Sequence, residues 1–138
     1  MQILAIKLKN IKSHRDTELT FSPGINVLSG PNGVGKSTIF EAIGYALFGV
    51  DAQTFVSNVE RFISIGEKKG EVAVTFQCDD GETYRATRTV ATPSKWLLAR
   101  QQGCGFEVEE LRTCYRGYCD LAVCRPSLIS RESLQQSP

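Results

Sequence analysis

The chain has 138 residues, of which 41% are hydrophobic and 22% charged, and its formal net charge is +1. This length suits one ordinary domain, and the composition favours a packed core over global disorder. No apolar run approaches the roughly 20 residues that span a bilayer, and the N-terminus lacks the apolar block of a signal peptide. The five cysteines are an odd number, which argues against a disulfide framework and indicates a reducing cytoplasm. The near-neutral charge provides no global attraction to nucleic acid.

The first 30 residues are predicted to form strands. Residues 2–8 place apolar side chains among polar ones, and residues 16–21 alternate with a period of two. A Ser-Pro-Gly turn at residues 22–24 leads into residues 25–28, a short apolar run that is typical of a buried central strand.

The hydrophobic period then changes. Ile39, Ile43 and Leu47 recur at four-residue spacing, which predicts a helix over residues 37–48. Residues 50–69 show no clean period, so we expect a loop there with at most a short helix at residues 54–62.

Two hairpins are predicted before residue 110. Alternating runs at 72–77 and 83–88 flank an Asp-Asp-Gly sequence, and Asp-Gly between such runs is a strong hairpin signal. A weaker pattern joins residues 96–100 to residues 106–109. Together these elements predict an α/β fold with a mixed, partly antiparallel sheet.

The most specific motif runs from Gly30 to Thr38, and GPNGVGKST fits the G-x-x-x-x-G-K-[ST] pattern of a phosphate-binding P-loop. Glycines let successive backbone N–H groups turn toward a phosphate, and the helix that follows adds its own unpaired N–H groups. Lys36 can reach the β- and γ-phosphates, and the Ser37 hydroxyl suits Mg²⁺, which prefers oxygen ligands. The sequence therefore predicts a site for ATP and Mg²⁺.

The loop and its surroundings resemble the N-terminal ATPase half of the SMC-like, ABC-type DNA-repair ATPases, and most of all the SbcC branch, whose members partner a double-strand-break nuclease. The resemblance rests on residues 6–24 (IKLKNIKSHRDTELTFSPG), residues 24–49 (GINVLSGPNGVGKSTIFEAIGYALFG) and the DDGETYRATR hairpin. The chain departs from that branch at Ile11 and Lys12, where an aromatic residue and an arginine are more usual. The resemblance implies a P-loop NTPase half-domain, with a helix after the P-loop.

The same resemblance implies roles for individual residues. Lys12 and Ser13 would lie beside the ribose and the α-phosphate, and an adenine-side loop would comprise Ile63, Ser64 and Ile65. The phosphates would be wrapped by Asn32, Gly33, Val34, Gly35, Lys36, Ser37 and Thr38. Among these, Lys36 would be the catalytic cation, Ser37 the metal ligand and Thr38 a contact of the α-phosphate.

A complete head of this kind needs further elements. In such ATPases the Walker B segment, the catalytic glutamate, the signature motif and the switch histidine follow a long coiled coil, and these 138 residues contain none of them. We therefore expect a fragment that hydrolyses ATP very poorly by itself. The implied partners are the complementary C-terminal ATPase lobe, a nuclease subunit and DNA, with head dimerisation only in a complete protein and no membrane.

Two other functions fit the P-loop. A stand-alone nucleotide-binding module could regulate a partner without turnover, and a RecF-like ATPase could bind DNA gaps without a long coiled coil. The DNA immediately downstream of the gene would discriminate among them: a heptad run favours SbcC or SMC, a continuous globular chain favours RecF, and a stop favours the module.

The last residues differ from the rest, because no period runs through residues 111–138 and their basic residues are all arginine. We predict that residues 1–110 form the N-terminal ATPase lobe and that residues 111–138 are a divergent or non-native tail. A zinc site is not expected from the later cysteines, which are Cys104, Cys114, Cys119 and Cys124. No two of them are separated by two residues, the spacing that is common in zinc sites.

Four other side chains have competing interpretations. His14, the single histidine, is either a solvated loop residue or a group near the nucleotide. Arg85 and Arg88 are expected on opposite faces of one strand, where they are solvated or contact DNA. Trp96 is expected in the core, because no second aromatic residue accompanies it as a base-stacking platform.

Overall fold

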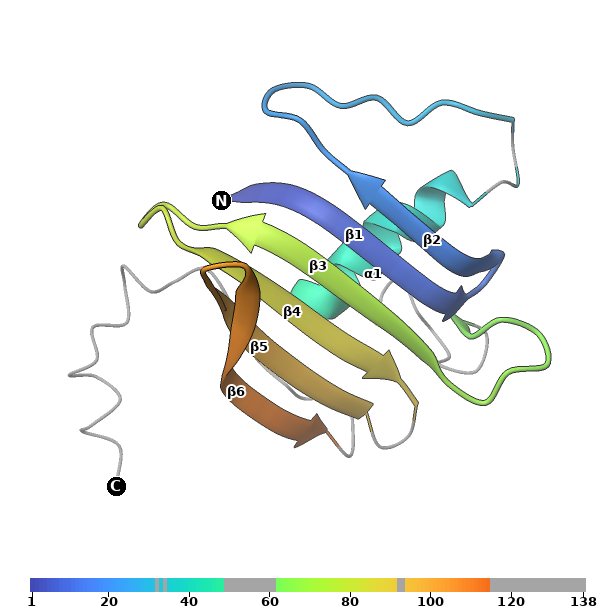
Figure 1. The fold of residues 1–138 in the computed structure, drawn as a ribbon. Helices are drawn as coiled ribbons and strands as arrows, with labels where there is room; N and C mark the ends of the chain where they lie inside the picture. Colours follow the sequence, from blue (N-terminus) through green and yellow to red (C-terminus); the bar gives the residue numbers. More distant parts are fainter. Residues whose placement is uncertain (32, 34, 49–61, 92–93, 115–138) are drawn as a thin grey trace.

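The described part of the chain is an antiparallel sheet with a helix on one face (Figure 1). The structure is a computed structural model that describes residues 1–31, 33, 35–48, 62–91 and 94–114. In chain order the elements are β1 (Gln2–Ile11), β2 (His14–Thr20), α1 (Lys36–Phe48), β3 (Gly70–Gln77), β4 (Thr83–Val90), β5 (Ser94–Gln102) and β6 (Gly105–Cys114). The strands are ordered β2-β1-β3-β4-β5-β6. Within these described ranges, no helix is long and apolar enough to cross a membrane.

Both predicted hairpins are confirmed. β3 and β4 pair antiparallel along their whole lengths, and the Gly81 N–H closes the turn by donating to the Cys78 carbonyl at 3.0 Å. Gly81 has a φ of 82°, a left-handed conformation that glycine adopts without steric cost. The second hairpin is longer than predicted. β5 and β6 pair along their whole lengths, from Ser94 opposite Cys114 to Gln102 opposite Gly105.

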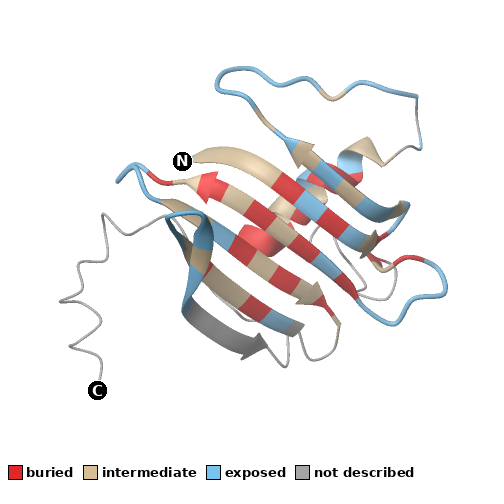
Figure 2. Ribbon diagram, in the orientation of Figure 1, coloured by how far each residue is buried: buried red, intermediate tan, exposed pale blue. Residues whose placement is uncertain are grey.

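The core lies between α1 and one face of the sheet. Buried side chains alternate with more exposed ones along β3, as expected because successive strand residues point to opposite faces (Figure 2). Trp96 is fully buried, as predicted, and its Nε1–H donates to the Ala46 carbonyl at 3.1 Å. This bond satisfies a carbonyl in the last turn of α1, which has no partner within the helix. The helix contributes to the core through its buried residues Ile39, Ala42, Tyr45, Ala46 and Leu47.

The sheet differs from expectation in two respects. Every strand pairing in the described residues is antiparallel, whereas a mixed sheet was predicted. Residues 25–28, predicted as a strand, form none, and Ile25 and Val27 are 95% and 80% exposed. This segment loops away from the sheet (Figure 1), and a strand needs a neighbouring backbone to satisfy its N–H and C=O groups. Here the Asn26 side chain instead bonds the backbone of Ser22.

Several expectations fall partly or wholly outside the described residues. The short helix expected at 54–62 is described only at Phe62. The predicted domain boundary at residue 110 remains a prediction; β6 continues to Cys114, and residues 115–138 are not described.

The two arginines of β4 do lie on opposite faces, but only Arg85 is exposed to solvent. Its guanidinium carbon lies 3.9 Å from the centre of the Phe106 ring. Arg88 is 3% exposed, and its guanidinium carbon lies 5.3 Å from the centre of the Tyr45 ring. Among the described residues, its Nε and Nη2 atoms have no hydrogen-bond partner. Burial therefore lowers the pKa of Arg88 below its ordinary value, with a smaller opposing effect from Tyr45.

Candidate functional site

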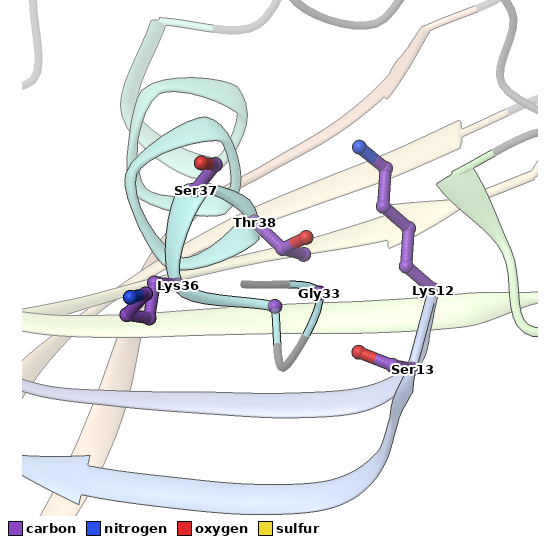
Figure 3. A pocket seen from close by; sticks show the side chains of 7 residues that line it. Lys12, Ser13, Gly33, Lys36, Ser37 and Thr38 are labelled. Atoms are coloured by element: carbon purple, nitrogen blue, oxygen red, sulfur yellow. The ribbon is translucent and has the colours of Figure 1, made fainter. Parts of the chain in front are cut away.

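A pocket of about 400 Å³ lies where the start of α1 meets the turn between β1 and β2 (Figure 3). The residues that line it are Lys12, Ser13, Gly33, Gly35, Lys36, Ser37 and Thr38. Each of them was selected from the sequence, and the fold brings the two separate segments together around one cavity. Two other predicted loop residues, Asn32 and Val34, lie outside the described residues.

The backbone of the loop requires its glycines. Gly33 and Gly35 both have a φ of 88°, in the left-handed region that other residues rarely adopt. At Gly35 there is also no room for a side chain, because a Cβ would lie 2.7 Å from the Ser13 Oγ and closer still to the His14 ring. At Gly33 a Cβ would meet none of the described residues within 4 Å. The loop therefore packs tightly on the β1–β2 turn at Gly35 and is open at Gly33.

The start of α1 supplies both charge and hydrogen-bond donors. The helix begins at Lys36, so the N–H groups of its first turn have no partners within the helix and can bind an anion. The Lys36 ammonium donates to the carbonyl of Gly30, at the opposite end of the loop. Ser37 is exposed, whereas Thr38 is 4% exposed. An incoming phosphate could replace the Gly30 carbonyl as the acceptor for Lys36, because an anionic acceptor makes a stronger hydrogen bond than a neutral one.

Lys12 approaches the pocket from the other side (Figure 3). Its φ of 47° is unusual for a residue other than glycine. Its Nζ lies 2.5 Å from the Glu41 Oε2 and 5.5 Å from the centre of the Phe62 ring. The Lys12 side chain is 36% exposed and the Glu41 side chain 20% exposed, so movement of the Lys12 ammonium toward a phosphate would leave a mostly buried carboxylate without this partner.

Glu41 was not selected from the sequence. It lies on α1, far along the chain from the β1–β2 turn, and only the packing of the helix against the sheet brings its carboxylate to Lys12. Its place on the helix face next to the P-loop was the sole sequence feature that could have indicated it.

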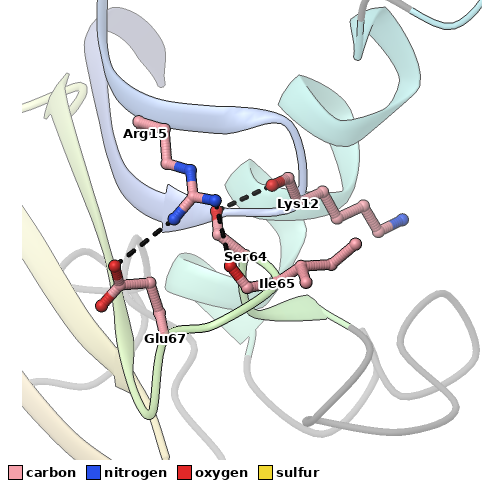
Figure 4. A network of polar contacts seen from close by, with 5 residues as sticks. All are labelled: Lys12, Arg15, Ser64, Ile65 and Glu67. Carbon is pink, nitrogen blue, oxygen red and sulfur yellow. Dashed lines mark hydrogen bonds and ion pairs between the residues drawn. The ribbon is translucent and has the colours of Figure 1, made fainter.

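The predicted adenine-side residues lie beside Lys12 (Figure 4). Ser64 is 2% exposed, and its hydroxyl donates to the Lys12 carbonyl at 2.7 Å. Arg15 Nη2 donates to the Ile65 carbonyl at 3.0 Å, while the Ile65 side chain is 92% exposed. Ile63 forms an isolated β-bridge with the end of β1. Of the three, Ile65 alone presents a largely exposed apolar side chain, and the Ser64 hydroxyl already has a partner within the protein.

His14 is not a solvated loop residue, which was one of its two interpretations. It begins β2 and is half-buried; its Nδ1 lies 3.0 Å from the Thr17 hydroxyl and its Nε2 lies 3.0 Å from the Gly35 carbonyl. The ring therefore contacts the P-loop backbone directly.

The described residues include only part of the cysteine set that was considered for a zinc site. Cys104 is exposed, Cys119 and Cys124 lie outside the described residues, and the part of the chain that is described contains no cluster of three or more potential metal ligands.

Comparison with known proteins agrees with the resemblance noted in the sequence. Residues 5–112 match the family described as AAA domain. Similar proteins include the DNA double-strand break repair Rad50 ATPase of Methanopyrus kandleri, which is 46% identical over 106 residues that cover 75% of this chain and 12% of that protein. The Rad50 ATPase of Thermoplasma volcanium is 41% identical over 95 residues, which cover 69% of this chain and 10% of that protein. The chain thus spans 10–12% of the length of these relatives.

The fold is also similar to a solved structure. The structure of the recombination mediator protein RecF with ATP, from the RecFOR pathway, matches with a TM-score of 0.64 at 18% identity and covers 75% of this chain and 28% of that one. At this identity the likeness concerns the fold alone. The family match, the relatives and the P-loop pocket agree: the chain belongs to the AAA domain family, as an N-terminal ATPase segment of the SMC/SbcC-like DNA-repair type.

Proposed function

We propose that this chain binds ATP with Mg²⁺ and forms the phosphate-binding part of an ATPase head that acts in DNA double-strand-break repair. The observation that carries the proposal is the pocket of about 400 Å³, in which the β1–β2 turn and the P-loop converge. The names of the Rad50 relatives support the DNA-repair context.

The residues present fit a polyphosphate. Gly33 and Gly35 both have a φ of 88°, and this left-handed backbone lets N–H groups of the loop turn toward an anion. Lys36 would neutralise charge on the β- and γ-phosphates, and Lys12 would contact the α-phosphate and the ribose side together with Ser13. Ser37 would hold Mg²⁺, which when bound neutralises phosphate charge. Thr38 would contact the α-phosphate, and the exposed Ile65 side chain would cover one face of the adenine.

The same residues predict binding without efficient turnover. Phosphoryl transfer depends on a group that orients the attacking water, and the residues that line the described pocket include no carboxylate. The chain's own residues would therefore bind and neutralise the nucleotide, while the water-orienting group would come from the complementary C-terminal lobe. In the complete assembly a nuclease subunit and DNA are the proposed further partners.

Calorimetry with MgADP and MgATP tests this proposal. We expect dissociation constants in the micromolar range or weaker, and affinity at least about tenfold lower for Lys36→Ala, because a charge-assisted hydrogen bond contributes roughly 1.5–3 kcal/mol. Lys68→Ala is the matched control, since Lys68 is an exposed lysine in the loop before β3. Equal affinities for the wild-type chain and Lys36→Ala would refute the assignment of the P-loop.

A further inference from the structure

His14 lies behind the P-loop rather than in the pocket. Gly35 and Lys36 line the pocket, and the His14 ring reaches the loop through the Gly35 carbonyl at 3.0 Å. The same ring crowds the position that a Cβ of residue 35 would take. The contact therefore combines a hydrogen bond with close packing, at a residue that the proposed phosphate site uses.

The partners of the ring fix its tautomer. A backbone carbonyl can only accept a hydrogen bond, so Nε2 must carry the hydrogen that is donated to Gly35. In the neutral imidazole Nδ1 is then an acceptor, and the Thr17 hydroxyl donates to it at 3.0 Å. Thr17 thus holds the ring in the tautomer and orientation that let it bind the loop.

The geometry of the peptide bond gives this contact a consequence for phosphate binding. The Gly35 C=O and the Lys36 N–H belong to one planar, trans peptide unit, so they point in opposite directions. A carbonyl held by His14 therefore leaves the Lys36 N–H directed away from the ring. A glycine at this position could otherwise rotate the peptide unit freely, and an anion cradle needs its N–H groups already directed inward.

We propose that His14 is a positioning residue for the phosphate site: it holds the Gly35–Lys36 peptide unit with the Lys36 N–H presented to the phosphates. This inference rests on the proposed nucleotide-binding function. It assigns His14 no contact with the nucleotide itself.

Three substitutions separate positioning from general packing. In His14→Gln the side-chain amide can place a donor near the position of Nε2, in His14→Asn the amide reaches only as far as Nδ1, and His14→Leu has no donor. We expect MgADP affinity about three- to tenfold lower in His14→Leu and His14→Asn, as for loss of one hydrogen bond, and within about twofold of wild type in His14→Gln. Rescue by glutamine and not by asparagine is a result that loss of packing alone does not produce.

The free chain provides a second measurement. Imidazole ¹⁵N shifts are expected to show the Nε2–H tautomer, and the Lys36 amide resonance is expected to broaden or shift in His14→Leu and to return in His14→Gln. Wild-type MgADP affinity in His14→Leu, a dominant Nδ1–H tautomer, or glutamine behaving like leucine would each overturn the inference. If Lys36→Ala abolishes binding while His14→Leu does not weaken it, this inference alone fails; if the wild-type chain binds no MgADP, the proposed function fails with it.

Discussion

The two P-loop glycines provide a matched pair of substitutions whose effects should differ by a calculable amount. Gly33 and Gly35 have the same φ of 88°, so alanine at either position carries the cost of the left-handed conformation, about 1–2 kcal/mol. A Cβ at Gly33 would meet nothing within 4 Å in the described part of the chain, whereas at Gly35 it would lie 2.7 Å from the Ser13 Oγ and against the His14 ring. Overpacking of this kind adds about 1–3 kcal/mol. We therefore expect Gly33→Ala to lower the free energy of unfolding by about 1–2 kcal/mol and Gly35→Ala by about 2–5 kcal/mol.

Urea denaturation followed by circular dichroism measures both values, and MgADP calorimetry measures the effect on the site. Gly35→Ala should also weaken MgADP binding more than Gly33→Ala, because the Cβ displaces the loop from the β1–β2 turn. Combining Gly35→Ala with His14→Ala should cost less than the sum of the two single changes, since the second removes the group with which the first collides. Equal destabilisation by the two glycine variants, or additive effects in the double variant, would refute the reasoning.

Three further changes test the core. Trp96→Phe is expected to lower the free energy of unfolding by about 1–3 kcal/mol, because it leaves the Ala46 carbonyl without its 3.1 Å donor; an unchanged urea midpoint would contradict this. Gly70→Ala should cost about 1–3 kcal/mol by the same assay, since a Cβ there would lie 2.7 Å from the Asn10 carbonyl oxygen. Arg88→Met should leave the free energy of unfolding unchanged or raise it by about 1 kcal/mol, because it removes a buried guanidinium with two nitrogens that have no partner among the described residues. A clear loss of stability would contradict this and would show that Arg88 has a partner that the described residues do not reveal.

Local patterns in the sequence were enough for most of the elements and for the phosphate loop. The helix at 37–48 and both hairpins follow from periods and turn residues that act over a few positions, and the structure confirms all three. The helix and the strands of the first hairpin begin within two residues of their predicted starts. The P-loop was identified because its chemistry is confined to one short run from Gly30 to Thr38. The resemblance then supplied Lys12 and Ser13, which the fold places on the same pocket.

What the sequence alone did not determine depends on contacts between segments that are distant along the chain. The apolar run at 25–28 has strand-like residues, yet whether it forms a strand depends on a neighbouring backbone, and the described sheet places none beside it. The burial of Arg88, the approach of Glu41 to Lys12 and the bond from His14 to the loop each join elements that only tertiary packing brings together. Periodicity and turn chemistry report backbone preferences over a few residues, so they predict which segments become strands or helices. Which side chains meet is decided by the order and register of the strands and by the face on which α1 packs, and these are properties of the whole fold.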